Sequence, residues 1–212
     1  VFAALGTGLS VASNGGSAMS NVAAAGYVAQ GQTGSSVYVT TVDKFAYSDD
    51  SRTTLSTGLS STRKFGMGFS NSGSAGYIGG GYSYSGGYTY YTTVDKFAFS
   101  DDSRTTLSTG LPTNQPWSPT GMADSGVAGY TLGGGAAHNL ETTDVSKFAF
   151  PSDSRSTLGT GVSAASRHGS AMADSGVAGY LALGNSYFVG DLDAMNRFAF
   201  PSDTRSLFTM VV

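Results

Sequence analysis

An internal repeat of about fifty residues constrains this chain more than any other feature of its sequence. Residues 92–111 recur with few changes at 40–59 and 143–162, and in a more divergent form from 194 to 211. A phenylalanine and an arginine each recur at steps of 52, 51 and 50 residues. They are Phe45, Phe97, Phe148 and Phe198, and Arg52, Arg104, Arg155 and Arg205. Self-similarity at this spacing is typical of repeat proteins, in which each unit cannot bury its faces alone.

Each repeat is predicted to form four short β-strands. The first surrounds a methionine, the second a tyrosine, the third a Lys-Phe-Ala or similar run, and the fourth begins at the marker arginine. The first two strands are separated by Asn or Asp followed two residues later by Gly, which favours a tight turn. Residues 94–99 alternate between two sets of side chains that both contain apolar groups, so we expect sheets covered on both faces. The methionines of the first strands are interpreted as core packing; they are Met19, Met67, Met122 and Met172.

Composition excludes several classes of protein. Only 12% of the 212 residues are charged and the net charge is −3, which argues against nucleic acid or anionic membrane as the main partner. No run approaches the roughly 20 apolar residues of a membrane-spanning helix. Cysteine is absent, so the sequence has no disulfides and no thiolate zinc sites. The 31 glycines, with many Ser, Thr and Tyr and few Lys or Glu, suit strands and turns and disfavour helices.

The order of motifs within a repeat resembles the kelch repeat of β-propellers. Residues 77–80 and 130–134 each end a hairpin strand with paired glycines, and a Lys-Phe segment and a polar Asp-bearing turn follow. The resemblance covers nearly the whole chain, although leucines stand where kelch repeats carry a tryptophan and the glycine pair is replaced at Ala29-Gln30 and reduced at Leu183-Gly184. These leucines are Leu55, Leu107, Leu158 and Leu207. The turn at 100–107 is also similar to the Asp-box of sialidase-type propellers. The tandem units resemble repeats of uncharacterised cyanobacterial and phage structural proteins, which implies no activity.

The kelch resemblance implies four-stranded antiparallel blades. We therefore predict an all-β fold, a four-bladed β-propeller closed by terminal strands, as a single domain over residues 1–212. Its repeats span about 10–59, 60–111, 112–162 and 163–212.

The two ends of the chain are predicted to take part in ring closure. Residues 1–9 resemble the end of a repeat and are predicted to complete the fourth blade, with 206–212 adding an edge strand or an oligomer contact. If neither segment closes the ring, the exposed edge is expected to pair between chains. Because the chain begins at Val1 and not at a methionine, we also expect a processed or truncated product.

Strand alternation sorts the connections onto two rims. Turns between the first and second strands and between the third and fourth are nearly uniform, which suits a scaffold. The other connections vary in length and in sequence, and functional residues are concentrated on such loops. They are residues 30–37, 82–90, 135–141 and 185–193, and 60–64, 112–119 and 163–168.

The distinctive side chains of the chain all fall in these variable connections. Exposed Tyr and Trp beside Asn, Ser and Gly suit stacking on sugar rings or anchoring of a protein partner. An alternative is that Tyr and Gly simply fill long loops. The candidate ligand-binding residues are Tyr82, Tyr84, Tyr88, Tyr90, Trp117, His138, Asn139, His168, Asn185 and Tyr187.

Repeated charged residues allow other interpretations. The marker arginines and the aspartates of the adjacent turns could form four ligand sites, but repeated salt bridges within the turns are favoured. The aspartates are Asp50, Asp102, Asp153 and Asp203, and a second cationic set, expected to be solvated or to span between blades, is Lys44, Lys96, Lys147 and Arg197. His138 with Glu141 and Asp144, or Asp191 with Asp193, could bind a cation, but ligand spacing is poor, and no metal or cofactor is predicted.

The sequence carries no catalytic motif of the common hydrolases. It has no Cys, no Gly-x-Ser-x-Gly elbow, no phosphate loop and too few loop carboxylates to supply an acid and a base. We therefore expect a non-catalytic, multivalent carbohydrate-binding protein, outside the cell or on a cell or virion surface, with glycans or a surface protein as partner. The alternatives are a self-assembling structural or adhesive component and, less favoured, a glycoside hydrolase or oxidase.

Overall fold

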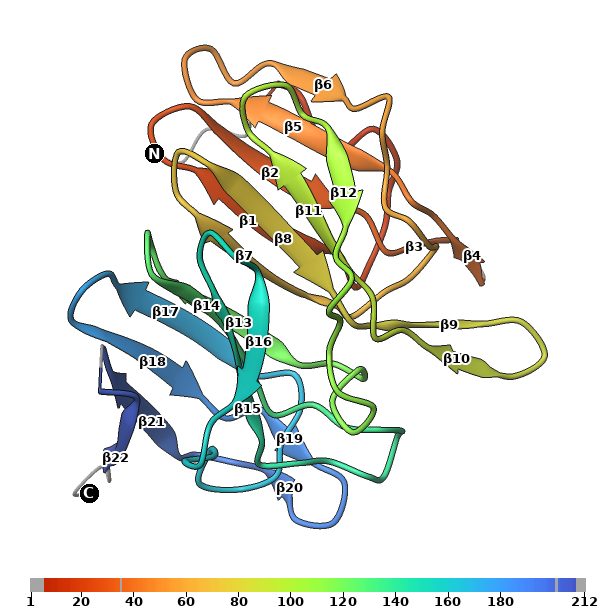
Figure 1. The fold of residues 1–212 in the computed structure, drawn as a ribbon. Coiled ribbons are helices and arrows are strands. Elements are labelled where there is room, and N and C mark those ends of the chain that lie inside the picture. Colours follow the sequence, from red (N-terminus) through yellow and green to blue (C-terminus); the bar gives the residue numbers. More distant parts are fainter. Residues whose placement is uncertain (1–5, 35, 201, 209–212) are drawn as a thin grey trace.

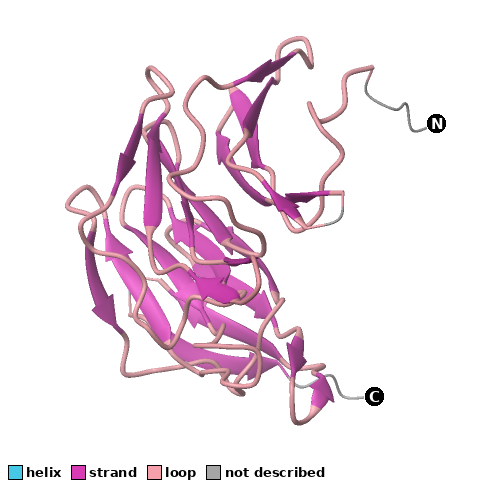
Figure 2. Ribbon diagram, turned by 90° about the vertical axis from the view of Figure 1, so that its right-hand side faces the viewer, coloured by secondary structure: helices cyan, strands magenta, loops and turns pink. Residues whose placement is uncertain are grey.

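A computed structural model describes residues 6–34, 36–200 and 202–208, and over these residues the chain is entirely strand, turn and loop (Figure 2). The strands form four four-stranded antiparallel sheets and three two-stranded hairpins. Within this part of the chain we find no helical segment with the length and hydropathy to cross a membrane. The expected all-β class is confirmed.

Each of the four sheets comes from one repeat, with strands in the expected order. The first sheet contains β1 (Ser17–Asn21), β2 (Ala25–Ala29), β5 (Val42–Ala46) and β6 (Arg52–Thr54). The second contains β7 (Met67–Asn71), β8 (Ala75–Gly79), β11 (Val94–Ala98) and β12 (Arg104–Thr106). The third contains β13 (Thr120–Asp124), β14 (Ala128–Leu132), β15 (Val145–Ala149) and β16 (Ser154–Thr157). The fourth contains β17 (Ser170–Asp174), β18 (Ala178–Ala182), β21 (Met195–Ala199) and β22 (Thr204–Phe208).

The hairpins are extensions of the connections between the second and third strands. They are β3 (Gln32–Thr33) with β4 (Val37–Tyr38), β9 (Tyr82–Tyr84) with β10 (Tyr88–Tyr90), and β19 (Asn185–Ser186) with β20 (Gly190–Asp191). The turns between the first two strands of the second to fourth sheets place Gly73, Gly126 and Gly176 at φ of 78°, 82° and 78°. Glycine adopts this left-handed conformation without a steric penalty, which explains the Asx-x-Gly signature.

The four sheets stand side by side in chain order (Figure 1). Their first strands lie innermost, with β1 packed against β7, β7 against β13, and β13 against β17. The fourth strands β6, β12, β16 and β22 form the opposite edge of each sheet from the first strands. The two middle sheets pack on both faces, so every residue of their second strands β8 and β14 is buried. Their third strands are mostly buried, as the apolar groups on both faces of residues 94–99 indicate.

The same three contacts recur wherever one sheet meets the next. One sheet presents a methionine or phenylalanine, a tyrosine and a lysine; the next receives them with a glycine, an aromatic ring and an aspartate. At the junction of the first and second sheets, Met19 fits against Gly76, the Tyr27 ring stacks on Phe99 at 5.2 Å, and Lys44 Nζ lies 2.7 Å from Asp102 Oδ2. The Tyr27 hydroxyl donates to the other oxygen of Asp102 at 2.8 Å.

These contacts correct the assignment of the repeated charges. Asp102, Asp153 and Asp203 do not pair with the arginine of their own turn; each accepts from the tyrosine and lysine of the preceding sheet. The lysines thus span between sheets, which is one of the two roles expected for them. The aspartate also holds a left-handed backbone conformation, with φ of 55° to 58° in these three turns, so its carboxylate projects towards the neighbouring sheet and away from the local arginine.

The prediction that terminal strands close a ring of four sheets is wrong for the described residues. The first and fourth sheets are the two ends of the row (Figure 1). Residues 6–10 lie along the first sheet: Arg52 Nη1 donates to the Gly8 carbonyl at 2.7 Å, and Ser10 N donates to Asp43 Oδ2 at 2.7 Å. The fourth sheet takes its outer strand from its own repeat, because β22 pairs with β21 from Thr204 to Phe208. Residues 1–5 and 209–212 of the two segments lie outside the described residues.

Candidate functional site

The variable connections lie together on one rim of the molecule, and the uniform turns lie on the opposite rim (Figure 1). In each repeat the two variable connections are tied by a single β-bridge. The bridges join Asn14 to Gln32, Lys64 to Tyr82, Trp117 to Gly135, and Arg167 to Asn185. These bridges hold the two variable connections of each repeat side by side.

In all four repeats, the residue that follows the first partner of this bridge has a left-handed backbone conformation. These residues are Gly15, Phe65, Ser118 and His168, with φ of 66°, 56°, 51° and 54°. Only the first is glycine, so the other three hold a conformation that costs about 1–3 kcal/mol each for ordinary residues. Together with their neighbours Gly16, Gly66, Pro119 and Gly169, three of them line a hollow of about 220 Å³ to which all four repeats contribute. Such clustered strain is a feature of binding sites.

A continuous row of aromatic rings crosses this rim. The centroid distances between successive rings run from 4.9 to 6.0 Å. In order, the rings belong to Tyr84, Tyr88, Tyr82, Phe65, His168, Trp117, His138 and Tyr187. We call this set the aromatic row. It brings together seven of the ten residues singled out from the sequence, and its rings come from six different connections.

The expectation that Trp117 is exposed is wrong, because its side chain is only 4% exposed. The guanidinium of Arg167 covers the indole at 4.4 Å, and the His138 ring lies 4.9 Å away. Arg167 is fixed in turn by the His138 carbonyl at 2.9 Å and by Glu141 at 3.5 Å. An indole is the largest apolar side chain, so burying it between two loops stabilises the rim more than exposing it would.

Asn185 also has a supporting position. Its Oδ1 accepts from Arg167 Nη2 at 2.9 Å, and its Nδ2 donates to Asp191 Oδ1 at 3.1 Å. His138 and Asn139 are exposed, and Tyr187 is 50% exposed. The sequence placed these residues in the variable connections, but it did not separate those that support the rim from those that are accessible on it.

A hollow of about 320 Å³ opens at one end of the aromatic row. Its walls are Gln32, Ser36, Tyr38, Lys64, Tyr82, Tyr84 and Tyr88. We call it the tyrosine hollow. Tyr84 and Tyr88 are 44% and 57% exposed and meet edge to face at 5.0 Å. The hollow combines accessible ring faces with hydroxyl, amide and ammonium groups.

Lys64 is the cation of the tyrosine hollow. Its Nζ donates to Gln32 Oε1 at 2.6 Å and lies 5.5 Å from the Tyr82 ring centroid and 5.9 Å from that of Tyr38. Burial, followed by the neighbouring tyrosines, raises the pKa of Tyr82 to about 12. Burial likewise raises the pKa of Tyr38. Both phenols therefore stay protonated at neutral pH and remain able to donate hydrogen bonds.

Sequence reasoning missed Gln32, Ser36, Tyr38, Lys64 and Phe65. Tyr38 belongs to the same kind of connection as Tyr82–Tyr84, so its position in the repeat was the available signal. Phe65 and Lys64 lie two and three residues before β7, the same repeat position as His168 and Arg167 before β17. Comparing the four repeats at this position would have found them.

The pKa of His168 is lowered below the 6.5 of an ordinary histidine, first by burial and then by the charges of Arg167 and His138. We expect an NMR titration of its imidazole to give a pKa below 6.5, with the signal assigned by its loss in His168→Gln. Because the folded state then binds this proton less readily than the unfolded state, its contribution to stability declines as the pH falls below about 6.5. A measured pKa of 6.5 or higher would contradict the packing described for this ring.

The described residues give little support to a cation site. In that part of the chain, no three His, Asp or Glu side chains converge as metal ligands do. Glu141 contacts Arg167, and Asp144 accepts from Asn114 at 2.6 Å. These carboxylates are therefore engaged with protein groups.

Comparison with known proteins shows the fold alone. No family model matches the chain, and no curated protein matches it either. The chain is similar to the solved structure of YjhT, with a TM-score of 0.74 and 14% sequence identity over 94% of this chain. It spans 65% of the length of the YjhT chain.

Proposed function

We propose that this chain is a non-catalytic carbohydrate-binding protein whose ligand rests against the aromatic row and the tyrosine hollow. The observation that carries the proposal is the tyrosine hollow itself, where accessible phenol rings stand beside several hydrogen-bond donors. The apolar face of a sugar ring packs on an aromatic ring, and its hydroxyls need polar partners. Lys64, Gln32 and the protonated phenol of Tyr82 supply such partners within the hollow.

We also propose that the four sheets are blades of a β-propeller. This is supported by their arrangement in chain order, with the first strand of each sheet packed against the first strand of the next. In such an arrangement the variable connections all open on one end of the central axis. This explains how loops about fifty residues apart form one surface.

The absence of a recognisable acid and base in the hollow favours binding over turnover. Its one charged residue is Lys64, and no carboxylate is among its lining residues. Glycoside hydrolysis commonly needs a pair of carboxyl groups that flank the scissile bond. Glycan-array binding followed by hapten elution tests the proposal, and the absence of binding to any glycan would count against it.

Replacing Tyr88 by alanine is expected to weaken glycan binding about tenfold, equivalent to about 1.4 kcal/mol, because an exposed stacking ring is removed. Tyr88→Phe keeps the ring and is expected to retain most of the affinity. The change in Tm should be small in both variants, since Tyr88 is 57% exposed.

Tyr47→Ala is the matched control for this measurement. Tyr47 is 50% exposed but lies at the end of the first sheet, outside the aromatic row. Its removal should leave the glycan Kd unchanged. Equal losses in Tyr88→Ala and Tyr47→Ala would place the ligand elsewhere.

A further inference from the structure

The two end sheets of the row expose opposite halves of the contact that joins every other pair of sheets. At each internal junction, a Met or Phe, a Tyr and a Lys of one sheet enter a Gly, an aromatic ring and an Asp of the next. Between the first and second sheets, Met19, Tyr27 and Lys44 contact Gly76, Phe99 and Asp102, respectively. Between the second and third sheets, Phe69, Tyr77 and Lys96 contact Gly129, Phe150 and Asp153. Between the third and fourth sheets, Met122, Tyr130 and Lys147 contact Gly179, Phe200 and Asp203.

The fourth sheet presents the entering half of this contact. Met172, at the repeat position of Met19 and Met122, is 68% exposed, whereas those two are 5% and 4% exposed. Tyr180 and Arg197 pair across β18 and β21 as Tyr130 and Lys147 do across β14 and β15. Tyr180 and Arg197 have no side-chain hydrogen-bond partner among the described residues, and both are partly exposed. We call these three residues the entering face.

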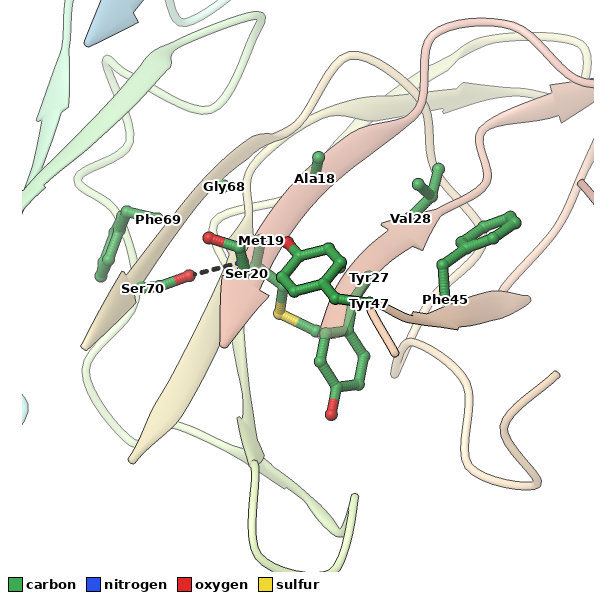
Figure 3. A pocket seen from close by; sticks show the side chains of 11 residues that line it. Ala18, Met19, Ser20, Tyr27, Val28, Phe45, Tyr47, Gly68, Phe69 and Ser70 are labelled. Atoms are coloured by element: carbon green, nitrogen blue, oxygen red, sulfur yellow. Dashed lines mark hydrogen bonds between the residues drawn. The ribbon is translucent and has the colours of Figure 1, made fainter. Parts of the chain in front are cut away.

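The first sheet presents the receiving half. Gly26 stands at the repeat position of Gly76, Tyr47 at that of Phe99, and Asp50 at that of Asp102. Phe45 is partly exposed, whereas the equivalent phenylalanines of the other three sheets are fully buried. The surrounding hollow has a volume of about 420 Å³ (Figure 3). We call Gly26, Phe45, Tyr47 and Asp50 the receiving face.

The receiving face is shaped for a side chain that enters from outside. Figure 3 shows Tyr47, Phe45 and Val28 among the side chains that line this hollow. The three atoms nearest to a Cβ at Gly26 would all belong to Tyr47 of the same sheet, the closest being its hydroxyl at 3.2 Å, whereas a Cβ at Gly76 or Gly179 would meet a methionine of the preceding sheet. The aspartate has no lysine or tyrosine from a preceding sheet among the described residues, so its charge is available for one.

We propose that these two faces dock two further repeats of the same kind, one against each face, which together complete a ring. Charge complementarity supports the occupant: the entering face ends in Arg197 and the receiving face in Asp50, the signs found at every internal junction. Exposed apolar groups as large as Met172, Phe45 and Tyr47 are typical of interaction surfaces.

The size of the occupant follows from the likeness to YjhT. Since 94% of this chain spans 65% of that one, the remaining 35% amounts to about 107 residues. This is roughly two steps of 50 to 52 residues. A second copy of this chain brings four sheets, twice what that space holds, so two repeats fit the open side better than a copy does.

The test joins a second copy of residues 60–162 to the C-terminus of the full chain. These residues form the second and third sheets, whose outer faces carry a receiving half with Gly76 and Asp102 and an entering half with Met122 and Lys147. Peroxide oxidation of Met172, followed by mass spectrometry, reports on docking at the entering face. We expect oxidation to slow about tenfold in the extended chain, while Met67 is protected in both chains.

Docking at the receiving face is measured by the effect of an Asp50 substitution on the Tm of each chain. Asp50→Asn should lower the Tm of the extended chain and leave that of the 212-residue chain unchanged. Asp49→Asn, a change at the neighbouring exposed turn residue, should have the same small effect in both chains.

Three results would overturn the proposal. Met172 could oxidise equally fast in both chains, or the added repeats could fail to increase the β-sheet signal in circular dichroism. The 212-residue chain alone could also protect Met172 as its mass doubles with concentration, which would assign the faces to a second copy.

Discussion

Replacing Asp95 by alanine is expected to lower the free energy of unfolding by about 3–5 kcal/mol, because the buried guanidinium of Arg63 then loses its counter-ion. Asp95 is fully buried and Arg63 is 2% exposed. One carboxylate oxygen of Asp95 accepts from Arg63 at 3.0 Å and from the Ser60 backbone at 2.8 Å, and the other accepts from Thr106 at 2.7 Å. Burial lowers the pKa of Arg63, whereas the charge of Asp95 raises it. Urea-induced unfolding gives the free energy directly.

The ion pair also anchors a connection on the variable rim. Arg63 donates to the Thr93 carbonyl at 3.0 Å, so the residues leading to Lys64 and Phe65 depend on it. In an Asp95→Ala background, Arg63→Met should recover part of the lost stability, since an apolar side chain no longer leaves a charge unpaired. Asp101→Ala is the control: this exposed carboxylate accepts from the Ser103 backbone, and its loss should cost less than about 1 kcal/mol. Equal losses at Asp95 and Asp101 would show that the buried pair is not a structural anchor.

Replacing Gly129 by alanine is expected to destabilise the fold by about 1–3 kcal/mol, or more if the sheets separate, because of overpacking. A Cβ at this position would overlap the ring of Phe69 from the second sheet. That ring is held between Tyr77 at 4.9 Å and Phe148 at 5.9 Å, so it has little room to move away. Thermal and urea-induced unfolding measure the loss.

The matched control for Gly129→Ala is Gly159→Ala. A Cβ at Gly159 would meet no atom within 4 Å, and this variant is expected to be nearly neutral. Phe69→Leu should reduce the cost of Gly129→Ala, a non-additivity that a double-mutant cycle detects. Additive losses would mean that the ring and the glycine do not share the space between the two sheets.

Most of the local structure could be predicted from the sequence. The Asx-x-Gly signatures mark the turns that end β7, β13 and β17, because the left-handed conformation of Gly73 and its equivalents is a local property. Alternation in residues 94–99 predicts a strand buried on both faces, and β11 is such a strand. The separation of uniform and variable connections onto two rims follows from the direction of alternate strands.

Contacts between repeats could not be read in the same way. The carboxylate of Asp102 is two residues from Arg104, yet it bonds Lys44, 58 positions away. Trp117 was expected at the surface but is buried under Arg167, which comes from another repeat. Lys64 and Tyr38 join Tyr82 to make the tyrosine hollow only because two adjacent sheets bring their hairpins together.

The sequence by itself determined the number of sheets, the strands in each and the rim on which the variable loops lie, since these depend on periodicity and on turns within one repeat. Only the tertiary structure decided that the first and fourth described sheets do not pack against each other. Met172 and Asp50 therefore lie at the two ends of the row of sheets. The physical reason is that closure depends on the rotation between successive sheets. That rotation is set by the side chains packed between them, such as Met19 against Gly76 and Phe69 against Gly129, and not by any single repeat.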